Sequence, residues 1–134
     1  MTTPLSAELT IFASDIYATR DFYADKLGFA VDVIGPDSIV AERDGLRLRI
    51  EGGARPRKRS KRWLQEAGVL VTLLPADFDA LVSELRGRDV ELLGEVMADE
   101  QGSRYIGFAD PDGNIFEITE RRLDPGARPR DEGD

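Results

Sequence analysis

The feature that most constrains the fold is a pattern that occurs twice along the chain. In each half, an alternating strand is followed by a helix and then by three further strands, with an Asp-Gly turn ahead of the last strand. The two turns are Asp44-Gly45 and Asp112-Gly113. Because a single βαβββ unit of this size cannot enclose a core, the repeat predicts two paired units that share one sheet system.

Hydrophobic spacing, together with the residues that begin and end helices, predicts the individual elements. In the first unit we expect a strand over residues 8–13, a helix from the Asp15 N-cap to Gly28, and strands in FAVDVI, SIVAER and LRLRIE. In the second unit we expect a strand in GVLVTLL, a helix in PADFDALVSELRGRD, and strands in VELLGEVM, SRYIGFAD and IFEIT. This pattern is typical of an α+β fold.

The chain is predicted to form a single domain over residues 1–122. Its units span about residues 5–51 and 67–120, and a basic linker at 52–66 separates them. The linker contains the run RPRKRSKR. The polar tail at 123–134 is rich in Gly and Pro and is predicted to be flexible.

Composition excludes several kinds of chemistry. The chain contains no cysteine and no histidine, which removes thiolate nucleophiles, Ser-His triads and imidazole metal sites. The net charge of −8 disfavours nucleic acid as a partner. No apolar run is long enough to span a membrane, and the start MTTPLSAELT lacks the pattern of a signal peptide. We therefore expect a cytoplasmic protein with neither a nucleic-acid nor a membrane partner.

Two stretches carry a resemblance to a known family: SDIYATRDFYADKLGF at 14–29 and SRYIGFADPDGNIFEI at 103–118. With the paired βαβββ order, they resemble the vicinal oxygen chelate superfamily of glyoxalases, bleomycin-resistance proteins and extradiol dioxygenases. The resemblance covers about residues 5–122. It implies a cup-shaped mixed sheet with helices on the outer face. It also implies a homodimer in which each cup draws strands from both partners.

The resemblance also implies four metal-ligand positions inside the cup. Here they fall on Glu8, on Glu51, on Val69 or Gly68, and on Glu117. Strand alternation independently directs the three glutamates toward the cup, because their apolar neighbours must face the helices. Three carboxylates suit a hard cation such as Mg²⁺, Mn²⁺ or Ca²⁺. Histidine is missing from the first and third positions, which argues against a catalytic metal and against iron dioxygenase chemistry.

Further candidates for ligand contacts lie on the same strands and in the linker. They are Phe12, Arg47, Arg49, Trp63, Arg104 and Tyr105. The aromatic residues are candidates to line the cavity, although Trp63 equally suits a hydrophobic plug that seals the linker. The arginines either contact the ligand or pair with carboxylates, and Arg104 equally suits a structural ion pair. The basic run at 55–62 either grips an anionic ligand or is a solvated connector.

These observations leave three functional hypotheses. The leading one is a small-molecule-binding protein of the glyoxalase/bleomycin-resistance type, which binds or sequesters its ligand without a histidine-ligated metal and without another cofactor. The drug-resistance members of the family sequester a cationic drug, which agrees with the acidic composition. The alternative is a metal-dependent lyase or isomerase in which Glu8, Glu51 and Glu117 hold a divalent cation and Glu51 and Glu117 are catalytic. The third is a dimeric module with a degenerate site.

Overall fold

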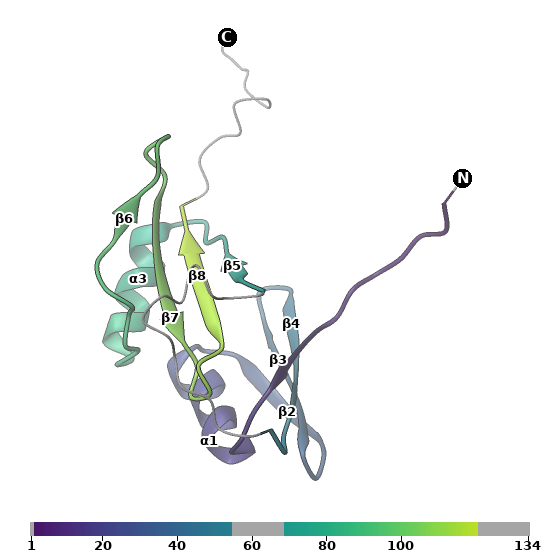
Figure 1. Cartoon of the computed structure of the whole chain (residues 1–134). Helices are drawn as coiled ribbons and strands as arrows, with labels where there is room; N and C mark the ends of the chain where they lie inside the picture. Colours follow the sequence, from purple (N-terminus) through teal and green to yellow (C-terminus); the bar gives the residue numbers. More distant parts are fainter. Residues whose placement is uncertain (1, 55–68, 121–134) are drawn as a thin grey trace.

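The computed structural model describes residues 2–54 and 69–120, and these residues form two four-stranded sheets with their helices (Figure 1). The first unit contains β1 (Leu9–Phe12), α1 (Ile16–Asp21), a π-helical turn η1 (Phe22–Lys26), β2 (Ala30–Gly35), β3 (Ser38–Arg43) and β4 (Leu46–Glu51). The second contains β5 (Val71–Leu73), α3 (Phe78–Gly87), β6 (Met97–Ala98), β7 (Arg104–Ala109) and β8 (Ile115–Thr119).

Both sheets have the same topology. Their strand orders are β1-β4-β3-β2 and β5-β8-β7-β6, and in each sheet the first pair is parallel and the others are antiparallel. The predicted α+β fold of two βαβββ units is therefore confirmed. The predicted linker at 52–66 lies outside the described residues from residue 55 on, as does the whole predicted tail at 123–134.

Short polar signals fix the ends of the helices and the register of the strands. Asp15 accepts hydrogen bonds from the backbone N–H of Tyr17 and Ala18, and so caps α1. Asp44 and Gly45 both have positive φ, of 49° and 85°, as a two-residue hairpin turn requires. This turn aligns β3 with β4 and thereby fixes which side chains share a face of the sheet.

One hydrophobic core joins the two units. Its largest members come from the helices and from the helix-facing side of both sheets: Tyr23, Leu48, Ile50, Leu85, Ile106, Phe108, Phe116 and Ile118. The Tyr23 ring meets Phe29 of the first unit and Phe116 of the second edge-to-face, with centroids 5.7 and 6.2 Å away. Burial of each such side chain contributes roughly 1.5–3 kcal/mol. Because the core residues of each unit pack on those of the other, neither unit encloses a core alone.

A hydrogen-bonded junction links the turn before β8 to the first unit. The hydroxyl of Tyr23 donates to Asp110 Oδ2 at 3.0 Å, and the backbone N–H of Ser14 donates to Asp112 Oδ2 at 2.9 Å. The side chain of Asn114 donates to a backbone carbonyl at the end of β1 at 3.3 Å. Burial and the nearby charge of Asp110 raise the pKa of Tyr23 well above 10.0, so its hydroxyl remains a donor. We call this region the closed junction.

Two predicted strands differ from the structure. The segment VELLGEVM forms an isolated bridge between Leu92 and Phe108 and then the short β6, rather than one strand. The reason is Gly94, whose φ of 90° turns the chain away from the sheet. The strand predicted in GVLVTLL is shorter than expected and is confined to β5.

Candidate functional site

Each sheet has a face opposite the helices, which we call the cup face. On β4 the alternation is clear: Leu48 and Ile50 are fully buried in the core, whereas Arg49 and Glu51 on the opposite face are partly exposed. On β8, Phe116 and Ile118 are buried while Glu117 is half-buried on the other face. The predicted orientation of Glu51 and Glu117 therefore agrees with the structure.

A fixed carboxylate dominates the cup face of the first sheet. Ser38 lies directly across from Glu51, and its hydroxyl donates to Glu51 Oε1 at 2.6 Å. Arg49 donates through Nε to the other oxygen, Oε2, and forms an ion pair with it. The hydrogen bond from Ser38, followed by that from Arg49, lowers the pKa of Glu51. Glu51 therefore carries its negative charge at neutral pH in a set orientation.

An exposed aromatic ring lies beside this carboxylate. Phe12 is the register partner of Glu51 in the parallel β1–β4 pair, and it is 53% exposed. Glu8 precedes β1, is exposed, and contributes with Glu51 to raising the pKa of Arg49. Phe12 and Glu51 therefore lie side by side where β1 and β4 end, Arg49 lies one cup-face position further back on β4, and Glu8 lies just before the start of β1. An aromatic ring with a charged group beside it offers contacts to both the apolar and the charged part of a ligand.

The cup face of the second sheet has a simpler polar arrangement. Glu117 lies between Thr72 of β5 and Gly107 of β7 in the strand register. The hydroxyl of Thr119 donates to Glu117 Oε1 at 2.8 Å. Tyr105 is the register partner of Thr119 and shares this face. Because Gly107 has no side chain, nothing from that residue covers the carboxylate.

The remaining predicted ligand contacts lie elsewhere. Arg104 lies on the helix-facing side, where it pairs with Asp79 at 2.9 Å and Glu120 at 2.8 Å, and its guanidinium lies 4.8 Å from the centre of the Phe78 ring. Arg47 is exposed and pairs loosely with Glu42 at 3.7 Å. Trp63 is outside the described residues.

The contacts of Arg104 are those expected if it forms a structural ion pair rather than a ligand contact. A ligand contact by Arg104 would first have to break these ion pairs. The ligand-binding roles of Arg47, Trp63 and Arg104 stay predictions.

The carboxylates of the described residues do not form a set that fits a divalent cation. Among residues 2–54 and 69–120, no three Asp or Glu side chains lie close enough to hold a metal ion. Both oxygens of Glu51 already accept from Ser38 and Arg49, and Val69 at the third family position offers no donor side chain. The predicted metal role of Glu8, Glu51 and Glu117 therefore finds no support in one chain.

Two residues of the site were not singled out from the sequence. Ser38 contacts Glu51, and Thr119 contacts Glu117. The signal for Ser38 is the two-residue Asp44-Gly45 turn: once Arg43 pairs with Leu46, counting outward pairs Ser38 with Glu51. Thr119 follows from alternation along β8, because it shares a face with Glu117.

The sequence pattern that defines the Glyoxalase/Bleomycin resistance protein/Dioxygenase superfamily matches residues 6–118. The chain therefore belongs to this superfamily. No protein with a curated description matches the sequence significantly. None of the described helices is long and apolar enough to cross a membrane.

Solved structures share the fold. A glyoxalase/bleomycin resistance protein/dioxygenase from Nocardioides is 21% identical with a TM-score of 0.71, covering 99% of this chain and 92% of that chain. A glyoxalase family protein from Enterococcus faecalis is 24% identical with a TM-score of 0.69, covering 84% and 94%. A virulence protein from Salmonella typhimurium is 19% identical with a TM-score of 0.64, covering 91% and 100%. At these identities the likeness concerns the fold, which hosts several activities.

Proposed function

We propose that the chain is a small-molecule-binding protein whose ligand lies in a cup between the cup faces of two sheets. The observation that carries this proposal is the pairing of a fixed, ionised Glu51 with the exposed Phe12 on the first cup face. An aromatic ring supplies area for a flat apolar body, and an oriented carboxylate supplies a charged anchor.

The ligand is proposed to be a cation with an aromatic or apolar part. The residues predicted for the cup include three negatively charged side chains, those of Glu8, Glu51 and Glu117, and two positively charged ones on β4, those of Arg47 and Arg49. Each arginine pairs with one carboxylate, Arg47 with Glu42 and Arg49 with Glu51, so the cup faces keep the negative charge of Glu8 and Glu117 in excess. The chain as a whole carries a net charge of −8, which attracts cations at long range. A cationic glycopeptide drug, sequestered in the cytoplasm to give resistance, fits these features.

A second copy of the chain is proposed to complete each cup. The helix-facing sides of both sheets pack into one shared core, while Phe12 on the first cup face remains half exposed. The segment before β1 projects away from the rest of the molecule, and its Leu5 is 92% exposed (Figure 1). A partner that covered these two apolar side chains would remove them from water. Light scattering should therefore give the mass of a dimer, and a monomer would contradict the shared cup.

Titration with bleomycin tests the binding proposal, followed by calorimetry and by the fluorescence of Trp63, the single tryptophan. We expect saturable binding that weakens by roughly tenfold in Phe12→Ala and in Glu51→Gln. Tyr17→Ala is the matched control, because Tyr17 is an aromatic of similar exposure, 65%, on α1 rather than on a cup face. Absence of saturable binding, or equal weakening in Tyr17→Ala, would contradict the proposal.

Metal analysis separates this function from the lyase or isomerase alternative. No observation in the described residues favours the alternative, since Glu51 is already engaged by Ser38 and Arg49. The binding function predicts that the purified chain, incubated with Mg²⁺ or Mn²⁺ and desalted, retains less than stoichiometric metal. Stoichiometric metal that is lost in Glu51→Gln would instead support the enzyme.

A further inference from the structure

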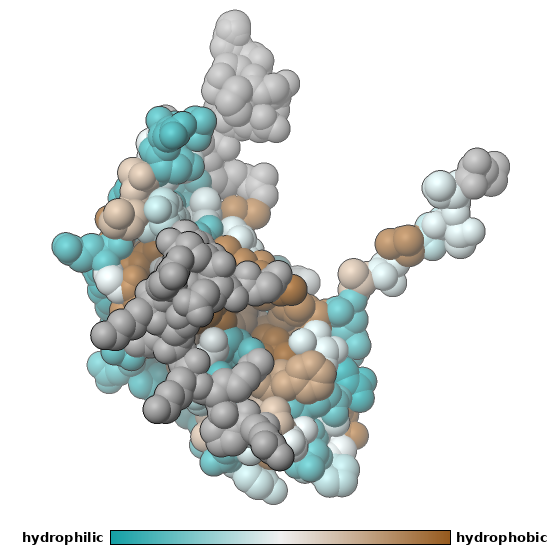
Figure 2. Space-filling view, in the orientation of Figure 1, coloured by the Kyte–Doolittle hydropathy of each residue, from teal (hydrophilic) through white to brown (hydrophobic). Residues whose placement is uncertain are grey.

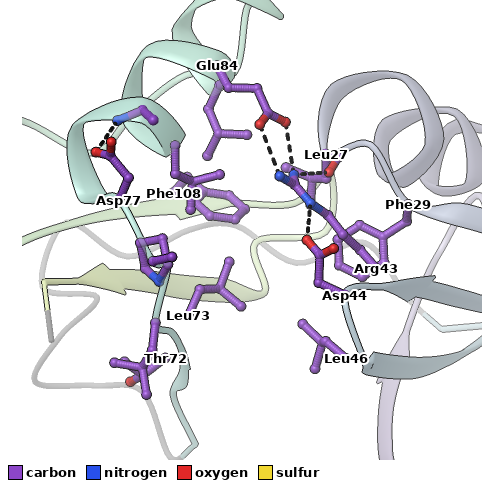
Figure 3. A pocket seen from close by; sticks show the side chains of 16 residues that line it. Leu27, Phe29, Arg43, Asp44, Leu46, Thr72, Leu73, Asp77, Glu84 and Phe108 are labelled. Atoms are coloured by element: carbon purple, nitrogen blue, oxygen red, sulfur yellow. Dashed lines mark hydrogen bonds and ion pairs between the residues drawn. The ribbon is translucent and has the colours of Figure 1, made fainter.

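A cavity lies on the helix side of the molecule, at the other contact between the two units. Its volume is about 430 Å³, within the usual range of small-molecule sites. Phe29 and Leu46 of the first unit line one side, and Leu73 and Phe108 of the second line the other (Figure 3); Leu81 of α3 is also part of the lining. In Figure 2, hydrophobic residues reach the surface near the middle of the molecule. We call this cavity and the contact around it the open junction.

The repeat explains why this cavity exists. Asp15 and Asp77 cap α1 and α3 in the same way, so the residues that follow them can be compared position by position. Eight residues after the cap, the first unit has Tyr23, whose ring fills the closed junction. At the same position the second unit has Leu85, a smaller side chain that borders the cavity. The open junction therefore lacks the aromatic ring that the closed junction contains.

The polar groups around the cavity are mostly acidic. Its lining contains one arginine, Arg43, and three carboxylates, those of Asp44, Asp77 and Glu84. Arg43 donates to Glu84 at 2.9 and 3.0 Å, to the carbonyl oxygen of Leu27 at 2.8 Å and to Asp44 at 3.3 Å. Its donors are thus directed at protein acceptors. In Figure 3, Asp77 lies on one side of the cavity and the Arg43–Glu84 pair on the opposite side.

We infer that the open junction is a second binding site, for a small arylalkylammonium ion. The aromatic ring of this ligand occupies the space among Phe29, Leu73 and Phe108. At this point the open junction has no ring equivalent to that of Tyr23. The ammonium group of the ligand is attracted by the negative charge around the cavity, because the three carboxylates of the lining outnumber Arg43 and Arg88, which both pair with Glu84. Of the residues assigned to the cup faces, only Thr72 of β5 also lines this cavity.

Amide NMR with phenethylamine as the probe tests the site directly on the isotope-labelled full chain. We expect saturable shifts at the amides of Leu46, Leu73 and Leu81. Phenylpropionate, which has a similar body and the opposite charge, should bind at least about fivefold more weakly. Equal affinity for the two probes would overturn the assignment of a cation, and shifts confined to other regions would overturn the site.

Two substitutions at matching helix positions provide the controls. Ala80 lines the cavity and is exposed, so Ala80→Phe should fill it and weaken phenethylamine binding by roughly tenfold. Ala18 is the corresponding exposed residue three positions after the Asp15 cap, and Ala18→Phe should leave binding unchanged. Equal binding in wild type and Ala80→Phe would overturn the proposal.

Two further variants test the charge and the independence from the cup. Asp44→Asn keeps a residue that tolerates the positive φ of 49° while removing one charge, and should weaken phenethylamine binding at least about twofold. Phe12→Ala should leave phenethylamine binding unchanged, because Phe12 belongs to the cup. Loss of phenethylamine binding in Phe12→Ala would assign the probe to the cup and overturn the second site.

Discussion

The closed and open junctions are two versions of the same contact between repeated units, and they differ in what fills them. At the closed junction, Tyr23 supplies both a ring and a hydroxyl, and Asp110 accepts that hydroxyl in the core. At the open junction, Leu85 leaves a cavity, and the polar link is the partly exposed Arg43–Glu84 pair. The difference indicates that one copy of the contact stabilises the fold while the other is available for a ligand.

The largest effect is expected when the closed junction is emptied. Tyr23→Ala should lower the free energy of unfolding by about 3–5 kcal/mol, because it removes a fully buried ring that contacts both units. Urea unfolding followed by circular dichroism measures the change. A loss below about 1 kcal/mol would mean that the junction collapses around the gap, and that Tyr23 is not the stabilising element.

A second test compares the polar links of the two junctions. Asp110→Ala should cost about 2–3 kcal/mol, because it leaves the Tyr23 hydroxyl and the backbone N–H groups of Asp112 and Asn114 without their acceptor. Glu84→Ala should cost less than about 1 kcal/mol, because the Arg43–Glu84 pair is partly exposed and leaves no fully buried group without a partner. Equal costs by urea unfolding would contradict the assignment of stability to the closed junction.

The closed junction should also respond to pH. Burial raises the pKa of Asp110, although hydrogen bonds from Asn114, Tyr23 and Asp112 oppose the increase. A carboxyl whose pKa is higher in the folded chain stabilises the fold at pH values below its unfolded pKa, of about 3.9, and loses this contribution as pH rises through the folded pKa.

The stability of the wild type relative to Asp110→Asn should therefore fall as pH rises above about 4. Urea unfolding of both chains in a series of acidic buffers measures this difference. A difference that grows with pH would show that the hydrogen bonds outweigh burial.

The smallest effect is expected when the open junction is filled. Ala80→Phe should change the free energy of unfolding by no more than about 0.5 kcal/mol, because Ala80 is exposed and the added ring enters space that is already present. Ala18→Phe is again the matched control. Thermal unfolding measures both, and a large destabilisation by Ala80→Phe alone would indicate that the cavity is smaller in solution.

Much of the fold followed from local sequence signals. Alternation in LRLRIE and NIFEI placed Leu48, Ile50 and Phe116 in the core and Glu117 on the opposite face. Successive side chains of a strand point to opposite faces, so assigning one face to the core also assigns the other. The segment around Gly94 was predicted less well, because eight mostly apolar residues suggest a strand while one positive φ interrupts it. Hydrophobic spacing carries no information about that bend.

The candidate site could be predicted only in part. Single residues such as Glu51 and Phe12 were recognised, since alternation shows which side chains leave the core. The contact between Ser38 and Glu51 depends on strand pairing, and the open junction depends on two units meeting far from each other in the sequence. The position of Arg104 beside Asp79 depends on where α3 crosses the second sheet. Contacts of this kind arise from tertiary packing and not from a local pattern.

The alternation along β4 has a consequence for how such proteins diverge. Stability depends on Leu46, Leu48 and Ile50, whereas Arg47, Arg49 and Glu51 occupy the other face and are partly exposed. Substitutions at every second residue can therefore change the chemistry of the cup at a small cost in folding free energy. Over evolutionary time, one strand can lose a metal ligand or acquire a new charge while its neighbours preserve the scaffold.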